Sequence, residues 1–198
     1  MPRMLYLIGV PGAGKTALMR MLVAPLGRQP VATPIPHTAL YAGPRGAKPA
    51  GAELGVRRET FSGTDALALD VQPKALQFLE QAPYPIVLAE GDRLANGKFF
   101  MAVMALGYDL HVVHVDCPPD LAAARRAARG SEQDARWVQG RVTKVARLAA
   151  AYASVVSDAV QAPGIQVARL RSLPGVGALL NDLYGGRYSD DANDRAAG

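Results

Sequence analysis

The residues from Gly9 to Thr16 have the types and the spacing of a loop that binds phosphate groups. Four residues separate Gly9 from Gly14, Lys15 and Thr16 follow directly, and an apolar stretch comes before them. Glycines let the backbone wrap around an anion with its N–H groups pointing inward, and the start of the next helix adds partial positive charge. Lys15 would reach the terminal phosphates of a nucleoside triphosphate, and Thr16 would offer a hydroxyl to Mg²⁺.

The expected nucleotide contacts are Gly9, Pro11, Gly12, Ala13, Gly14, Lys15 and Thr16. The alternative is a glycine-rich turn without a ligand, but the apolar run before the motif and the helical pattern after it favour a phosphate site.

A second group of chemically capable residues follows the apolar run 85–89. Glu90 ends this run, where an acidic side chain can hold Mg²⁺ beside the phosphates. Asp92 is a candidate general base, with a helix cap as the alternative role. Arg93 would bind a substrate phosphate or pair with Asp92.

Asp65 is the rival candidate for the general base. Ser62 and Thr64 stand beside it, and their hydroxyls together with the carboxylate suit a site for the phosphoryl acceptor. A plain helix start is the alternative interpretation of this segment, and it is the better one for Ser62 alone.

Residues 125–147 contain seven lysines or arginines and only two acids, in a chain whose net charge is +5. Such a local excess indicates an anionic partner, although a solvated helix face is the simpler explanation. Arg125 and Arg129 lie four residues apart and share a helix face, and phosphoryl transfer needs cations near the charge that develops. The Gly130–Ser131 break would act as the hinge of a lid.

Other cations and one aromatic residue are candidates for substrate or DNA contacts. Trp137 would stack on a base, or else cover the edge of the core. The remaining candidates are cations near Trp137 and in the Pro/Gly-rich loop, namely Arg141, Lys144, Arg45, Arg57 and Arg58.

Apolar runs alternate with helical patterns along the chain, which predicts a parallel sheet covered by helices on both faces. Strands are expected at 4–8, near 35–41, and at 85–89, 110–115 and 165–170, and the rest of 30–58 is expected to be loop. Helices are expected at 17–23, from 64 or 65 to 81 with a break near Pro73, at 92–106, from about 118, and at 134–153 and 176–183.

The pattern predicts one domain over 1–184, with a lid at about 125–147 and a flexible tail at 185–198. A single cysteine excludes an internal disulfide and fits a reducing compartment. No apolar run approaches the roughly 18 residues of a membrane span, so we expect no membrane partner and a cytoplasmic location. The sequence does not predict an oligomeric state.

With these motifs the chain resembles the P-loop kinases of nucleosides and nucleotides. The likeness rests on the phosphate loop, on Glu90 to Arg93, and on Asp116 and Pro118 followed by Arg125 and Arg129. It implies ATP and Mg²⁺ as cofactors and a five-stranded parallel sheet with the strand before Glu90 beside the first strand. Segment 41–65 departs from the usual monophosphate-binding region of that superfamily, which leaves the acceptor open.

A narrower likeness is to phage-type kinases that phosphorylate 5-hydroxymethyluracil in DNA. It rests on three segments, residues 61–67, 90–94 and 129–144 with Trp137. This resemblance implies a DNA partner whose target base is flipped out or single-stranded. The alternatives are a kinase of a free nucleotide, nucleoside or other small metabolite, and a nucleotide-binding switch with slow hydrolysis.

Overall fold

The computed structural model describes residues 1–44, 47–58, 62–130, 133–156 and 163–186. These residues form a seven-stranded sheet with the order β2-β3-β4-β5-β1-β6-β7. The strands are β1 (Arg3–Ile8), β2 (Gly27–Val31), β3 (His37–Tyr41), β4 (Gly51–Leu54), β5 (Ile86–Glu90), β6 (Asp109–Val115) and β7 (Ala153–Val156). The helices are α1 (Lys15–Val23), α2 (Gln72–Glu80), α3 (Gly97–Ala105), α4 (Pro119–Ala128), α5 (Ala135–Tyr152), α6 (Pro163–Ser172) and α7 (Val176–Leu183).

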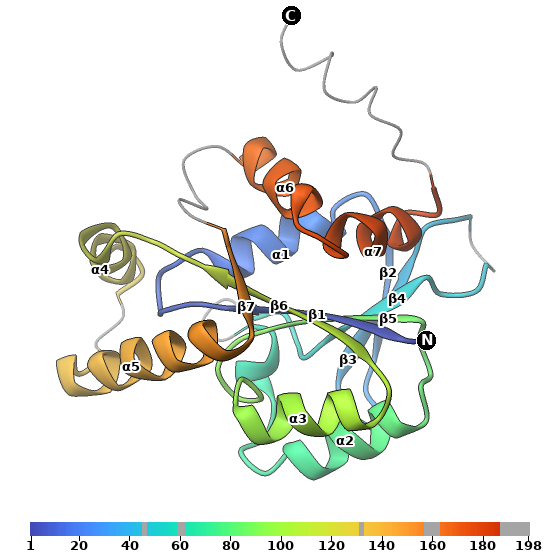
Figure 1. The fold of residues 1–198 in the computed structure, drawn as a ribbon, viewed down its shortest axis with the longest axis horizontal. Coiled ribbons are helices and arrows are strands. Elements are labelled where there is room, and N and C mark those ends of the chain that lie inside the picture. Colours follow the sequence, from blue (N-terminus) through green and yellow to red (C-terminus); the bar gives the residue numbers. More distant parts are fainter. Residues whose placement is uncertain (45–46, 59–61, 131–132, 157–162, 187–198) are drawn as a thin grey trace, which may run out of the picture.

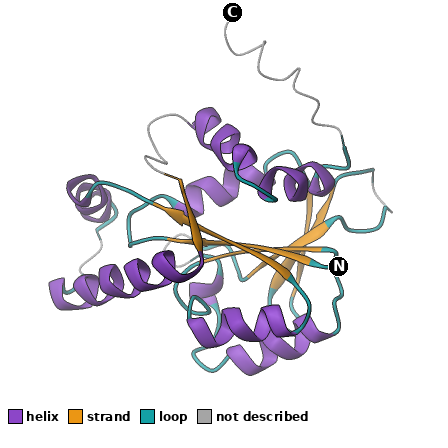
Figure 2. Cartoon of the chain, in the orientation of Figure 1, coloured by secondary structure: helices purple, strands orange, loops and turns teal. Residues whose placement is uncertain are grey.

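The sheet lies between two layers of helices (Figures 1 and 2). Strand β1 is buried on both faces because successive side chains point to opposite sides. Leu5 and Leu7 join the core formed with α1, α6 and α7, whereas Met4 and Tyr6 join the core formed with α2, α3 and α5. Because both faces are buried, the sequences of the central strands are continuous apolar runs and do not alternate with polar residues.

The predicted parallel five-stranded sheet is confirmed as the contiguous set β4-β5-β1-β6-β7, whose neighbours all pair in parallel. The strand near residues 35–41 is confirmed as β3, but it pairs antiparallel with both β2 and β4 and extends the sheet. The expectation of loop for the rest of 30–58 missed β4.

The prediction of a strand at 165–170 is wrong, because these residues belong to helix α6. The fifth parallel strand is instead β7, which starts directly after α5. Val167, Leu170 and Leu173 follow one another at intervals of three residues and pack on the α1 side of the sheet, as a helical face does.

Two predicted helices start later than expected. Residues 64–66 form only a 3-10 turn (η1, Thr64–Ala66), and α2 begins at Gln72 with Pro73 in its first turn. Helix α3 begins at Gly97, and Asn96 caps it by accepting a hydrogen bond from the Phe99 N–H at 2.9 Å. Asp92 is therefore not a helix cap.

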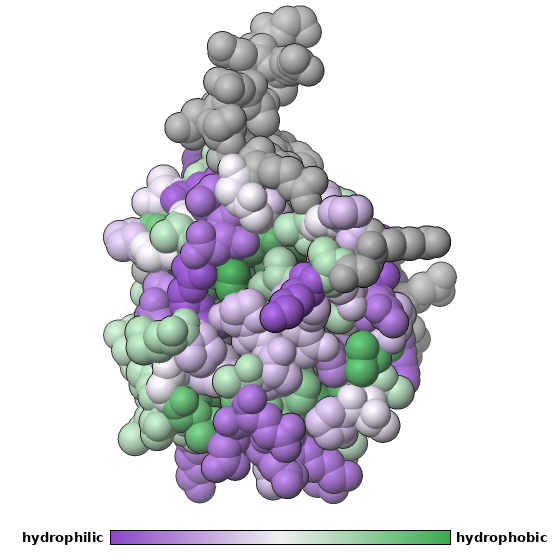
Figure 3. All heavy atoms as spheres, turned by 90° about the vertical axis from the view of Figure 1, so that its right-hand side faces the viewer, coloured by the Kyte–Doolittle hydropathy of each residue, from purple (hydrophilic) through white to green (hydrophobic). Residues whose placement is uncertain are grey.

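The hairpin of β2 and β3 ends the sheet on the side that Figure 3 presents. Hydrophilic and hydrophobic residues are interspersed over this face (Figure 3). Strand β2 is mostly exposed and contains Pro30, a residue that discourages further strand pairing at a sheet edge. None of the helices in the described ranges has both the length and the apolar character of a membrane crossing. The division into a domain of residues 1–184, a lid and a tail stays a prediction, and residues 187–198 lie outside the described part.

Segments 47–58 and 62–66 pack tightly against each other at Gly55. Gly55 has a φ of 100°, and a Cβ there would lie 1.9 Å from the Gly63 carbonyl oxygen. Gly107 has a similar φ of 82°, but a Cβ there would meet no atom within 4 Å. Comparing Ala at these two positions separates backbone strain from a steric clash.

We expect Gly107→Ala to lower the free energy of unfolding by about 1–2 kcal/mol, from backbone strain alone. Gly55→Ala should cost roughly 2 kcal/mol more, because the methyl group must displace backbone atoms. Urea denaturation of both variants measures the difference. An equal loss of unfolding free energy in the two variants would contradict the close contact between Gly55 and Gly63.

Candidate functional site

The predicted phosphate loop connects β1 to α1 at the carboxyl end of the sheet. Gly12 and Gly14 have φ values of 91° and 97°, which glycine adopts without strain. The Lys15 Nζ curls back over the loop and donates hydrogen bonds to the carbonyls of Gly9 at 2.9 Å and Val10 at 3.3 Å. Lys15 therefore bridges two carbonyls of the loop and closes it on itself.

Sheet register brings Glu90 to this loop. Strands β1 and β5 pair in parallel with Leu7 opposite Glu90, so the end of β5 lies beside the start of the loop. The Thr16 Oγ1 donates a hydrogen bond to Glu90 Oε1 at 2.9 Å. A hydroxyl and a carboxylate in contact are the oxygen ligands that Mg²⁺ accepts alongside phosphate oxygens and water. The Thr16 hydroxyl and the Glu90 carboxylate thus fit the Mg²⁺ site that the sequence predicts.

Burial changes the protonation of the charged groups at this point. The Glu90 side chain is almost fully buried, which raises its pKa to about 7, although Lys15 and Thr16 act in the opposite direction. Burial likewise lowers the pKa of Lys15, while Glu90 and Asp65 oppose that change. Such perturbed pKa values are typical of functional sites.

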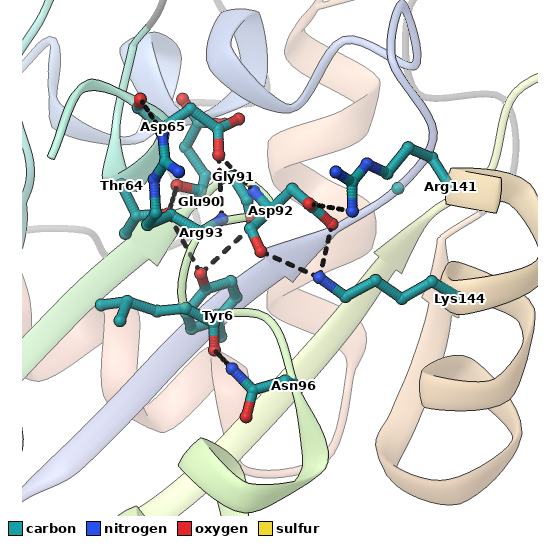
Figure 4. Close-up of polar contacts among 12 residues, drawn as sticks. Tyr6, Thr64, Asp65, Glu90, Gly91, Asp92, Arg93, Asn96, Arg141 and Lys144 are labelled. Atoms are coloured by element: carbon teal, nitrogen blue, oxygen red, sulfur yellow. Dashed lines mark hydrogen bonds and ion pairs between the residues drawn. The ribbon is translucent and has the colours of Figure 1, made fainter. Parts of the chain in front are cut away.

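Asp65 holds the turn that follows Glu90. Its Oδ1 accepts hydrogen bonds from the backbone N–H groups of Asp92 at 2.7 Å and Arg93 at 2.9 Å (Figure 4). Arg93 also donates from Nη2 to the Asp65 carbonyl at 3.3 Å. Arg93 is therefore bound to Asp65 and not, as one prediction had it, to the Asp92 carboxylate.

Thr64, which the sequence predicts as a substrate contact, lies in the interior of the protein. Its side chain is fully buried, and its Oγ1 donates to the Glu90 carbonyl at 2.9 Å. Tyr6, which the sequence did not single out, joins it from β1 (Figure 4). The Tyr6 hydroxyl lies 3.2 Å from Thr64 Oγ1 and donates to the Gly91 carbonyl at 3.1 Å. This network fixes segment 63–65 against the turn 90–93.

Asp92 is held by cations from α5. Its two carboxylate oxygens lie 2.7 Å from Arg141 Nη1 and 2.7 Å from Lys144 Nζ (Figure 4). The Arg141 guanidinium also lies over the Trp137 ring, 4.8 Å from its centroid. Two of the five cations predicted to contact substrate or DNA are thus engaged by Asp92, and both Asp92 carboxylate oxygens contact a cation. Trp137 remains 39% exposed.

One cavity of about 420 Å³ gathers residues from distant parts of the chain. Its lining includes Gly12, Gly14, Lys15, Thr16, Ala17, Arg20, Ser62, Arg125, Ala128 and Arg129. The phosphate loop, Arg125 of α4 and Arg129 directly after α4 therefore face a common space. Ser62 reaches this cavity, and Arg20 on α1 is a further cation that the sequence did not single out.

The other predicted substrate contacts have different surroundings. Arg57 forms an ion pair with Glu53 at 2.9 Å. Arg58 is exposed, and both its N–H and its carbonyl bond to the Ser62 hydroxyl, at 3.2 and 2.7 Å. Arg45 lies outside the described residues, as does Ser131 of the predicted hinge.

The buried Glu90 carboxylate yields a prediction about stability in metal-free protein. Its pKa is raised from 4.5 to about 7 in the folded state, so the folded protein binds a proton more tightly than the unfolded chain. Stability is therefore lost as the pH rises from about 4.5 through 7. Glu90→Gln removes this loss and should raise the free energy of unfolding at pH 8 by about 1–3 kcal/mol, with a much smaller gain at pH 5. Denaturation in EDTA at both pH values measures it, and an equal gain at both would contradict the buried carboxylate.

Comparison with known proteins agrees with this geometry. No curated protein matches the chain. The family model described as P-loop Nucleotide Kinase3 matches residues 1–173, which contain the phosphate loop, Glu90, Asp65 and the arginines of α4. The match covers most of the 198 residues, and the chain belongs to the P-loop Nucleotide Kinase3 family.

Proposed function

We propose that this protein is an ATP- and Mg²⁺-dependent kinase that transfers the γ-phosphate to a hydroxyl group. One observation carries the proposal, namely the cavity that combines the phosphate loop with Arg125 and Arg129 beside the bonded pair of Thr16 and Glu90. Phosphoryl transfer needs cations around the transferring group and a metal site at its edge, and this cavity offers both.

The roles of the residues follow from their positions. The N–H groups of the loop would bind the phosphates of ATP, and Lys15 would leave the loop carbonyls to contact the terminal ones. Thr16 and Glu90 would hold Mg²⁺, which neutralises charge on the β- and γ-phosphates when bound. Arg125 and Arg129 would stabilise the charge that develops on the transferring phosphate.

Asp65 is the better candidate for the general base. Among the described residues, none donates a hydrogen bond to its Oδ2, whereas both oxygens of Asp92 face a cation. Asp65 also acts electrostatically on Lys15 and Glu90, which supports a role beside the transferring phosphate. Asp65 would accept the proton of the acceptor hydroxyl while that oxygen attacks the γ-phosphorus and ADP leaves.

For the acceptor we propose the hydroxymethyl group of 5-hydroxymethyluracil in DNA. The exposed Trp137 ring beside Arg141 supports this choice, because an aromatic surface next to cations suits an unstacked base and its backbone. The resemblance at residues 61–67, 90–94 and 129–144 supports it as well. A free nucleotide, nucleoside or other small metabolite is the second candidate, and a switch with slow hydrolysis is the third.

The two aspartates give a sharp test of the mechanism. Asp65→Asn keeps an oxygen that can accept the N–H groups of Asp92 and Arg93 but removes the base, so transfer in a single turnover should fall by about 10²–10⁴. Asp92→Asn keeps one side-chain oxygen for a cation, and Lys144 keeps its bond to the Asp92 backbone carbonyl, so this variant should reduce transfer far less. Melting curves of both variants should match that of the wild type, as a control that they remain folded. A slow Asp92→Asn variant beside an active Asp65→Asn variant would reverse the assignment.

The acceptor is tested with γ-labelled ATP, Mg²⁺ and a panel of nucleosides, nucleotides and single-stranded DNA with or without 5-hydroxymethyluracil. We expect label only in the hydroxymethylated DNA, and we expect binding of that DNA to weaken steeply as salt rises. Label in a small molecule would show the second candidate to be correct, and release of phosphate alone would favour the switch.

Trp137→Ala should weaken binding of this DNA by roughly 1–3 kcal/mol if the ring stacks on a base. Val142→Ala is the matched control, because Val142 lies on the same helix and is also 39% exposed. Substitutions of Arg141 or Lys144 are less informative, since they also release Asp92. Equal binding by the Trp137 and Val142 variants would remove Trp137 from the DNA contact.

A further inference from the structure

Helix α4 packs against the outer side of the phosphate loop (Figure 1). A Cβ on Gly12 would lie 2.4 Å from the Ala122 carbonyl oxygen, so the loop and the helix touch through their backbones. This contact leaves no room for a side chain at Gly12. It also places the arginines of α4 within reach of the loop carbonyls.

Arg126 makes the shortest of these contacts. Its Nη1 donates a hydrogen bond to the Pro11 carbonyl at 2.8 Å. The neighbouring Arg125 Nη1 lies 3.5 Å from the Gly12 carbonyl and 3.4 Å from Cys117 Sγ. A charged donor at 2.8 Å makes a strong hydrogen bond, whereas 3.5 Å is at the limit of one. Arg126 does not line the cavity that Arg125 and Arg129 share.

The contact with Pro11 fixes the direction of an N–H group. In a planar trans peptide, the carbonyl of one residue and the N–H of the next point in opposite directions. Because Arg126 holds the Pro11 carbonyl, the Gly12 N–H must point away from Arg126. Gly12 is among the residues that line the cavity, so this N–H is available to a phosphate there. Glycine offers little resistance to rotation of that peptide. The Ala13 N–H closes the turn by donating to the Val10 carbonyl at 3.1 Å, and the bond from Arg126 adds a contact to the Pro11 carbonyl itself.

We propose that Arg126 is a positioning residue for phosphate binding, which acts by holding the Pro11–Gly12 peptide with its N–H toward the cavity. The inference rests on the proposed function, because it concerns the same loop. It differs from the roles of Arg125 and Arg129, which would contact the phosphates directly. Arg126 acts only through the loop backbone.

The test uses inorganic tripolyphosphate with Mg²⁺, a probe that has phosphates and no base, and measures its binding by calorimetry. Arg126→Ala should weaken binding roughly tenfold, the usual effect of losing one hydrogen bond of this kind. Arg126→Lys should recover most of the affinity, because lysine still offers a charged donor. Arg136→Ala is the matched control, since Arg136 is exposed on α5 and its loss removes the same charge.

Wild-type affinity in Arg126→Ala, or equal losses in Arg126→Ala and Arg136→Ala, would overturn the proposal. The Gly12 amide signal in ¹H–¹⁵N spectra of ligand-free protein gives a second measurement. It should move in Arg126→Ala and stay in place in Arg136→Ala, and an unmoved signal would also overturn the proposal. If the wild-type protein fails to bind tripolyphosphate and ATP, the proposed function is wrong, while the Gly12 signal still decides whether Arg126 orients the peptide.

Discussion

The parallel pairing of β1 with β5 is the constraint on which the whole candidate site depends. Because Leu7 stands opposite Glu90, the loop that starts after β1 and the acidic turn that follows β5 emerge side by side. The bond from Thr16 to Glu90 is a direct result, although the two residues are 74 positions apart. The apolar runs of both strands, buried on each face, stabilise this register and thereby bring the loop and the acid together.

The turn 90–93 connects three parts of the molecule. Asp65 accepts hydrogen bonds from two of its N–H groups, and Tyr6 donates one to the Gly91 carbonyl. Arg141 and Lys144 of α5 hold the half-buried carboxylate of Asp92. A displacement of α5 would therefore act on the backbone that Asp65 contacts. On the other side of the loop, α4 makes a similar connection through Arg126. The basic segment thus supports the site through its backbone contacts as well as through charge.

The sequence was most informative where a local pattern determines the structure. The phosphate loop and strands β1, β5 and β6 were predicted correctly because their residue types and spacing are sufficient. The last strand was predicted at 165–170, where the chain forms helix α6, and β7 was missed. Residues 165–170 have apolar residues at intervals that suit a strand or a helix, and only their packing on α1 decides for the helix. Asp92 was predicted as a candidate general base because the sequence does not show its ion-pair partners. Arg141 and Lys144 lie about 50 residues further along the chain. The role of the Tyr6 hydroxyl could not be predicted, since the neighbouring residues of its strand are all apolar and indicate only a buried core strand.

The central claim is that the loop after β1 binds the phosphates of ATP for transfer, with Lys15 at the terminal ones. The most direct measurement compares wild-type protein with Lys15→Ala for Mg²⁺-dependent binding of ATP and for consumption of γ-labelled ATP in a single turnover. The account predicts that Lys15→Ala keeps a normal melting curve, binds ATP more weakly and no longer transfers or releases the γ-phosphate. A folded Lys15→Ala protein that binds and consumes ATP as the wild type does would contradict the account.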